Sequence, residues 1–207
     1  MAKTIKIYPE NPSEKLINEI IETLKNDGVI IYPSDTVYGL GCDIFNHKAM
    51  EKLARIKGVK LEKTQFSFIC SDLSNLSQFT KPVDNSIFKL MKRALPGPFT
   101  FILNASNNLP SYYKNKKTVG IRIPDNLLPR LLVERLGNPI ASISTYSNDE
   151  IIEYFTDPEL IAEKYDKLVD LIIDSGIGDY TASTVVDVTS GEPVVIRQGK
   201  GDLEKFL

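Results

Sequence analysis

The 207-residue chain is predicted to fold as a single α/β domain that spans residues 1–207. Short apolar runs rich in β-branched residues alternate with segments whose apolar residues recur every three to four positions, which is typical of strands interleaved with helices. The strands predicted at 183–188 and 194–197 are joined by a turn at 190–193, and such a hairpin makes the sheet mixed. A hydrophobic content of 42% supplies the core.

The first half of the chain begins with a predicted strand at residues 4–8 and a helix that ends near Gly28. Asn11 is predicted to cap this helix, because Pro12 suits the first helical position and Glu14 stands three residues after the cap. A strand at 29–32, a helix at 47–57 and a short strand at 66–70 follow.

The second half continues the alternation of helices and strands up to the closing hairpin. Helices are predicted at 84–95, at 127–136 and near 158–165. Strands are predicted at 99–103, 119–123, 139–144 and 168–173.

Residues 29–42 are the most informative stretch of the sequence. The apolar run at 29–32 is stopped by Pro33, and three oxygen-bearing side chains follow at Ser34, Asp35 and Thr36. Gly39 and Gly41 then form a predicted glycine loop that allows either positive φ or a close approach to the backbone. Small polar groups at the end of a strand favour a ligand site in an α/β protein. The alternative is an ordinary turn in which Asp35 and Thr36 bond their own backbone.

The charge is unevenly distributed along the chain. Residues 48–122 contain 14 Lys and Arg against 4 Asp and Glu, which is +10 in a chain whose net charge is −2. Such a segment indicates a face that meets phosphate or another anion, and the alternative is helices with solvated lysine faces.

Several functional classes receive no support from the composition. Cys42 and Cys70 are far apart and make no metal-binding pair, so each is predicted to be a small buried hydrophobe. The single histidine, His47, stands at a predicted helix N-terminus and is expected at the surface. No apolar run approaches the length of a membrane span, and the first residues enter a strand without a signal-peptide core. We therefore expect a cytoplasmic protein without membrane association.

Five sequence motifs resemble those of the YrdC/YciO family, the threonylcarbamoyl-AMP synthase-like proteins. The first is Tyr-Pro-Ser-Asp-Thr-Val-Tyr-Gly-Leu-Gly at residues 32–41. The others are Pro-Gly-Pro-Phe-Thr at 96–100, Val-Gly-Ile-Arg-Ile-Pro at 119–124, Ser-Thr-Val-Val-Asp at 183–187 and Arg-Gln-Gly at 197–199. The resemblance covers nearly the whole chain.

The resemblance implies an open, twisted α/β sheet curled around a positively lined cavity. It also implies a nucleotidyltransferase that makes threonylcarbamoyl-AMP from threonine, bicarbonate and ATP, for threonylcarbamoyladenosine modification of tRNA. A downstream threonylcarbamoyl transferase and tRNA or double-stranded RNA are the implied partners. Mg²⁺ is expected to arrive with ATP, because no cluster of Asp or Glu indicates a metal site built by the protein.

On the matching positions, the resemblance divides the site residues into two groups. The residues expected to contact threonine or its carbamate are Ser34, Thr36, Arg122 and Ser183. Those expected at the nucleotide are Lys57, Ser144 and Arg197, and Lys60 joins them because its charge can offset that of the triphosphate. Lys57 and Arg122 are the candidate catalytic residues. The chemistry suits these residue types, because Arg122 can clamp a carboxylate or carbamate and the other cations can offset triphosphate charge. Each residue also has a structural alternative; Arg122, for example, could pair with a surface carboxylate.

The sequence departs from the synthases in two places. Their Lys-x-Arg reads Lys57-Gly58-Val59 here, and their Ser-Ala-Asn reads Ser144-Thr145-Tyr146. Both departures resemble the YciO branch and predict a slow enzyme, although Lys60, Lys63 or Asn148 could compensate. The alternative functions are an RNA-binding module and a YciO-like protein that binds RNA or nucleotide with weak or no synthase activity.

Overall fold

The computed structural model of the protein describes all residues except 9–10, 114–115 and 146–155. The strands of the described residues are β1 Lys3–Lys6, β2 Ile30–Tyr32, β3 Gly39–Asp43, β4 Ser67–Ile69, β5 Phe99–Asn104, β6 Thr118–Arg122, β7 Ile140–Ser144, β8 Leu171–Asp174, β9 Thr184–Asp187 and β10 Val194–Arg197. The helices are α1 Glu14–Lys25, α2 His47–Ile56, α3 Leu76–Phe79, α4 Asn85–Ala94, α5 Leu127–Leu136 and α6 Pro158–Tyr165, with short 3-10 turns at Ser111–Tyr113 and Leu203–Phe206.

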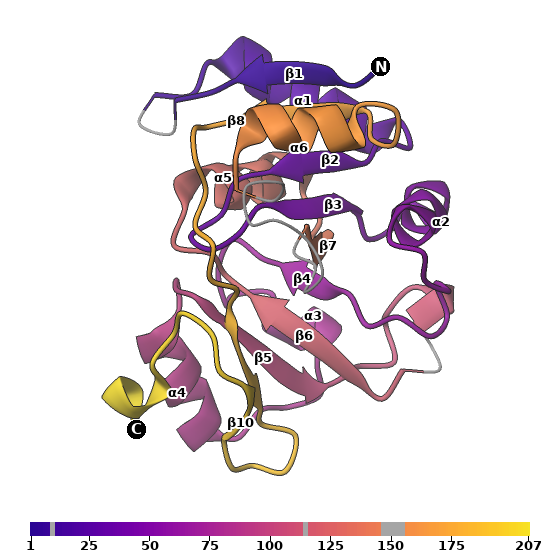
Figure 1. The fold of residues 1–207 in the computed structure, drawn as a ribbon. Helices are drawn as coiled ribbons and strands as arrows, with labels where there is room; N and C mark the ends of the chain where they lie inside the picture. Colours follow the sequence, from indigo (N-terminus) through magenta and orange to yellow (C-terminus); the bar gives the residue numbers. More distant parts are fainter. Residues whose placement is uncertain (9–10, 114–115, 146–155) are drawn as a thin grey trace.

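All these strands belong to one mixed sheet, which confirms the predicted α/β class. Their order is β1-β8-β2-β3-β7-β4-β6-β5-β9-β10, so β1 and β10 are its edges and the sheet is open. β1, β8 and β2 run parallel, whereas β3 and β7 are antiparallel to their neighbours. β9 and β10 form the predicted antiparallel hairpin. Figure 1 shows the twist: β1, β2 and β3 run across the view, while β5 and β6 descend steeply.

Helices cover both faces of this sheet, and the sheet divides the hydrophobic core into two parts. On one face α1 packs against α5, and the predicted apolar stripe of α1 is buried there beside β1, β2 and β8. The larger core on the other face takes the apolar residues of α2 and α4. Cys42 and Cys70 are buried there as predicted, and burial raises the pKa of the Cys70 thiol to about 12.

The start of α1 corrects the predicted cap. The N-cap is Ser13 rather than Asn11, because the first helical hydrogen bond runs from the Ile17 N–H to the Ser13 carbonyl at 3.0 Å. Asn11 instead donates its backbone N–H to the Tyr8 carbonyl at 3.2 Å. Pro12 therefore lies outside the helix.

A second correction concerns residues 39–43, which form strand β3 and not a glycine loop. Gly39 and Gly41 pair with Tyr32 and Ile30 of β2, and neither glycine has positive φ. A Cβ on Gly39 would lie 2.9 Å from Cζ and Oη of Tyr32, and one on Gly41 would lie 2.5 Å from Cγ2 of Ile140. The alternative of close approach is therefore the right one, and the approaching groups are side chains of the protein itself.

No helix in the described ranges is long and apolar enough to cross a membrane.

Candidate functional site

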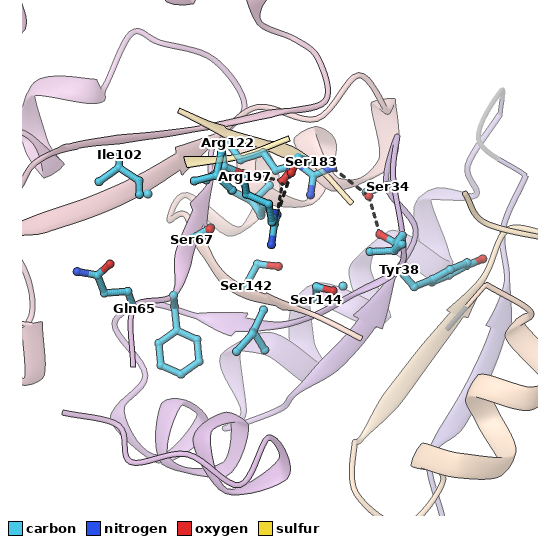
Figure 2. A pocket seen from close by; sticks show the side chains of 18 of the residues that line it. Ser34, Tyr38, Gln65, Ser67, Ile102, Arg122, Ser142, Ser144, Ser183 and Arg197 are labelled. Atoms are coloured by element: carbon cyan, nitrogen blue, oxygen red, sulfur yellow. Dashed lines mark hydrogen bonds between the residues drawn. The ribbon is translucent and has the colours of Figure 1, made fainter. Parts of the chain in front are cut away.

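A cavity of about 260 Å³ lies on one face of the central sheet. Its walls contain two guanidinium groups, those of Arg122 and Arg197, and no carboxylate among the described lining residues. Figure 2 shows both arginines with Ser183 on one wall, across from Ser142 and Ser144. The cavity therefore combines positive charge with hydroxyl groups, a lining that suits an anionic polar ligand.

The curl of the sheet closes one end of this cavity. β6 carries Arg122, and the loop after β2 carries Asp35; three strands separate β6 from β2. At about 4.8 Å per strand, a flat sheet would hold β2 and β6 about 19 Å apart, beyond the reach of an arginine side chain. Yet Arg122 Nη2 lies 2.7 Å from Asp35 Oδ1. The chain ends of distant strands meet because the sheet bends around the cavity, as expected.

Arg122 is fixed by three consecutive residues. Its Nη2 donates to Ser34 Oγ at 3.3 Å, Asp35 Oδ1 at 2.7 Å and Thr36 Oγ1 at 2.5 Å. Of the guanidinium nitrogens of Arg122, only Nη2 donates a hydrogen bond to another described residue. The side chain is 12% exposed and lines the cavity, but its Nε is buried, so a ligand in the cavity would meet Arg122 at the terminal nitrogens of the guanidinium.

The loop at residues 34–36 has features of both structures considered for it, a ligand site and an ordinary hydrogen-bonded turn. Ser34 Oγ stabilises the turn by accepting the Thr36 N–H at 3.1 Å and donating to the Val37 carbonyl at 2.8 Å, and it also lines the cavity. Asp35 does not bond its own backbone through its side chain but pairs with Arg122. Thr36 is completely buried and is not a lining residue, and its hydroxyl accepts a hydrogen bond from Arg122.

Arg197 and Ser183 lie beside Arg122 on the same wall of the cavity (Figure 2). Arg197 Nη2 donates to the Ser183 carbonyl at 2.8 Å and lies 3.4 Å from Ser183 Oγ. Ser183 Oγ also shares a hydrogen bond with Thr100 Oγ1 at 2.9 Å, across the parallel pair β5 and β9. Edge strand β10 thus delivers Arg197 to the cavity, and a serine just before β9 fixes its head group.

The floor of the cavity includes Tyr32 and Ser142, which sequence reasoning did not identify. The Tyr32 ring crosses the two glycines of β3, and its hydroxyl hydrogen-bonds Ser142 Oγ on β7. Burial raises the pKa of Tyr32 to about 12, so this hydroxyl is neutral at physiological pH. The available signal was the pair of glycines seven and nine positions after the tyrosine, which leaves space for its ring.

The predicted nucleotide residues are only partly assembled on the cavity. Ser144 and Arg197 line it, but Lys57 and Lys60 are not among its described lining residues. Lys57, the C-cap of α2, donates from Nζ to the Ser144 carbonyl at 3.0 Å and so stands beside the cavity. Lys60 is exposed in the following loop. Tyr146 and Asn148 lie outside the described residues.

No group of His, Cys, Asp and Glu in the described ranges could hold a metal ion. His47 is at the surface, where its Nδ1 lies 3.7 Å from Glu51 Oε1.

Comparison with known proteins gives the relationships of the chain. The Sua5/YciO/YrdC family model, described as telomere recombination, matches residues 22–199. The chain is 40% identical over 210 residues to the uncharacterized protein YciO of Escherichia coli strain K12, covering 100% of both proteins. It is 32% identical over 178 residues to the threonylcarbamoyl-AMP synthase of Coxiella burnetii, covering 85% of this chain and 94% of the synthase.

Solved structures agree with these relationships. The crystal structure of E. coli YciO superposes with a TM-score of 0.90 over 100% of both chains, at 40% identity. A crystal structure of P. abyssi Sua5 complexed with L-threonine superposes with a TM-score of 0.87 at 27% identity, covering 98% of this chain and 59% of that one. The family match and the full-length similarity to YciO show that this protein belongs to the Sua5/YciO/YrdC family.

Proposed function

We propose that this protein is an L-threonylcarbamoyladenylate synthase-like nucleotidyltransferase that forms threonylcarbamoyl-AMP from threonine, bicarbonate and ATP. The main support for the proposal is that Arg122 and Arg197 line the same cavity. Its described lining contains hydroxyl groups but no carboxylate. A site for two anionic groups, a carboxylate and a phosphate, needs two cations of this kind. The relationship to a threonylcarbamoyl-AMP synthase and the threonine complex of Sua5 support the choice of substrate.

The residues divide between the two ends of the substrate. Arg122, Ser34 and Ser183 hold the threonine or carbamate end, and Thr36 contributes by fixing Arg122. Arg197 and Ser144 bind the nucleotide from the cavity wall, with Lys57 beside Ser144. Lys60, exposed in the adjoining loop, reaches the outer phosphates when ATP is bound.

The chemistry requires positioning more than covalent help from the protein. Threonine and bicarbonate first form a carbamate, with a new N–C bond and loss of water. A carbamate oxygen then attacks the α-phosphorus of ATP, and the bond to the bridging oxygen breaks, so that its electron pair leaves on pyrophosphate. Arg122 orients the amino acid, while Arg197 and Lys57 stabilise the phosphate charge. Mg²⁺ enters bound to ATP and offsets the charge of the triphosphate.

The proposed product serves modification of tRNA to threonylcarbamoyladenosine through a separate threonylcarbamoyl transferase. We expect slow turnover, because Val59 stands where the synthases have an arginine and is an exposed aliphatic side chain. Tyr146 is the second departure, known from the sequence alone.

The test is pyrophosphate release from purified protein with threonine, bicarbonate and ATP-Mg, and with each of the three omitted in turn. We expect release that needs all three substrates and that is lost in Arg122→Ala. Release that continues without threonine would contradict the proposal, because it would indicate hydrolysis of ATP.

A second candidate, RNA binding, is favoured by a basic depression outside the cavity. It has a volume of about 630 Å³ and is lined by Lys81, Lys116 and Lys117 together with polar residues of 104–107. Phosphate contacts make affinity fall steeply with salt. Binding of tRNA that weakens with salt and also weakens in the double variant Lys81→Ala/Lys117→Ala would support this function. If the double variant binds tRNA as well as the wild type does, this depression is not the RNA-binding site.

A further inference from the structure

A buried carboxylate lies directly behind the arginine of the proposed threonine site. The Asp35 side chain is 8% exposed, and its Oδ1 lies 2.7 Å from Arg122 Nη2. Asp35 is not a lining residue of the cavity, so it has no place of its own at a ligand there. Its effect on a ligand passes through Arg122.

The ion pair is incomplete in a specific way. Arg122 Nε and Asp35 Oδ2 are both buried and have no hydrogen-bond partner among the described residues. A pair selected for stability alone would dock edge to edge, with two parallel hydrogen bonds that use both of these atoms. Here Nη2 instead converges on oxygens of three consecutive residues, Ser34, Asp35 and Thr36, and one buried donor and one buried acceptor are left unpaired. Leaving buried polar groups unpaired costs free energy, which indicates a role other than stability.

We propose that Asp35 is a positioning residue that holds Arg122 in the orientation needed to recognise a carboxylate group of the substrate. The inference rests on the proposed function and extends it to a residue outside the cavity wall. Asp35 occupies Nη2 and leaves the other terminal nitrogen, Nη1, to the ligand, while Nε is buried.

The surroundings hold both partners of the pair in place. The Asp35 carbonyl accepts a hydrogen bond from Lys200 Nζ at 2.7 Å, and the same ammonium lies 2.7 Å from Asp179 Oδ2. The backbone of Arg122 is fixed by β6 and by the Cys70 N–H, which donates to the Arg122 carbonyl at 2.9 Å. With both backbones fixed, the remaining freedom is rotation of the arginine side chain, and the carboxylate restricts it.

The test compares Asp35→Asn, which keeps the shape, with Asp84→Asn as the matched control. Asp84 is exposed, and as the N-cap of α4 it makes no side-chain hydrogen bond to the helix. Calorimetry measures the dissociation constants of L-threonine, L-threoninamide and ATP. We expect Asp35→Asn to weaken threonine binding about tenfold or more and to abolish the preference for threonine over its neutral amide. ATP binding and all constants of Asp84→Asn should stay within about twofold of wild type.

Thermal unfolding separates a positioning role from a merely structural one. If folded Asp35→Asn has a lower unfolding midpoint but wild-type threonine affinity and preference, the positioning role is wrong. A second measurement needs neither threonine binding nor a change at Asp35. Nitrogen NMR of the guanidinium of Arg122, assigned by its loss in Arg122→Lys, reports rotation about the Nε–Cζ bond.

Slow rotation in the wild-type protein supports the proposal, and free rotation overturns it. Absence of threonine binding by the wild type would instead count against the proposed function, while the NMR measurement would still decide whether Arg122 is held.

Discussion

Arg122 Nη2 lies 2.5 Å from Thr36 Oγ1, although β3, β7 and β4 separate the strand of Arg122 from the strand that precedes Thr36. Thr36 is completely buried, so this hydrogen bond is formed away from solvent. The threonine of the family signature therefore hydrogen-bonds an arginine whose strand lies four positions away in the curled sheet. The site depends on the curvature of the sheet as much as on the residues themselves.

Replacing Arg122 should separate the two ends of the proposed substrate. Arg122→Ala is expected to weaken threonine binding by about ten- to a hundredfold, the effect of losing a charge-assisted hydrogen bond, and to leave ATP binding nearly unchanged. Calorimetry with each ligand measures this, and Arg93→Ala, at an exposed position on α4, is the control. An equal loss of affinity for threonine and for ATP would identify Arg122 as a structural cation.

Replacing Arg197 should have the opposite pattern. Arg197→Ala is expected to raise the ATP dissociation constant by about ten- to a hundredfold, because a guanidinium facing the cavity is lost from the phosphate side. Threonine affinity should change little, since Ser183 keeps its hydrogen bond to Thr100. An unchanged ATP constant in a folded variant would remove Arg197 from the nucleotide site.

The alternation of strands and helices could be predicted from local patterns, because each pattern reports the burial of its own segment. The helices at Leu127–Leu136 and Pro158–Tyr165 and the strand at Val194–Arg197 have the predicted bounds. The nature of β3 could not be predicted, because glycine suits a loop and a crowded strand equally. Only the position of the Tyr32 ring decides between them.

The site shows a similar limit. The family resemblance pointed to Ser34, Arg122, Ser144, Ser183 and Arg197, which the structure places on one cavity. The pairing of Arg122 with Asp35 could not be predicted, since it joins elements 87 residues apart through a bend that no local pattern encodes. The Tyr32–Ser142 contact was missed for the same reason: it crosses strand β3, whose existence was not predicted.

The glycine in the middle of the cavity floor should be intolerant of a side chain. Gly39→Ala would place a methyl group 2.9 Å from the Tyr32 ring and 3.1 Å from Ser142 Oγ. Overpacking of this kind costs about 1–3 kcal/mol, which urea unfolding measures. Gly58→Asn is the control, because nothing lies within 4 Å of its Cβ position and asparagine tolerates its φ of +65°. A Gly39→Ala protein as stable as wild type would show that Tyr32 moves freely.

Buried tyrosines predict a loss of stability in alkali. Burial raises the pKa of Tyr32 to about 12 from 10.0, so between these values the unfolded chain releases a proton that the folded protein retains. The free energy of unfolding is therefore undiminished below about pH 10 and falls as the pH rises toward 12, by about 2–3 kcal/mol for this group. Tyr32→Phe should make the fall less steep in urea unfolding across this range. If the free energy of unfolding of Tyr32→Phe falls as steeply with pH as that of the wild type, Tyr32 does not contribute to the loss of stability in alkali.

The departure at Val59 predicts a gain of function. Val59→Arg restores a guanidinium two residues after Lys57, in an exposed position. One recovered contact with phosphate is expected to speed pyrophosphate release by about tenfold, since 1.36 kcal/mol corresponds to that factor. Val59→Gln lengthens the side chain without the charge and should leave the rate near wild type. A slower Val59→Arg enzyme would indicate that neighbouring groups already fill this role.

The most direct measurement of the central claim is the identity of the nucleotide product. Wild-type protein is incubated with ATP-Mg, ¹³C-bicarbonate and ¹⁵N-threonine, and the nucleotides are analysed by mass spectrometry. The account predicts an AMP-containing product that carries both isotopes and is missing from the Arg122→Ala reaction. AMP or ADP alone, from a protein that binds both threonine and ATP, would contradict it.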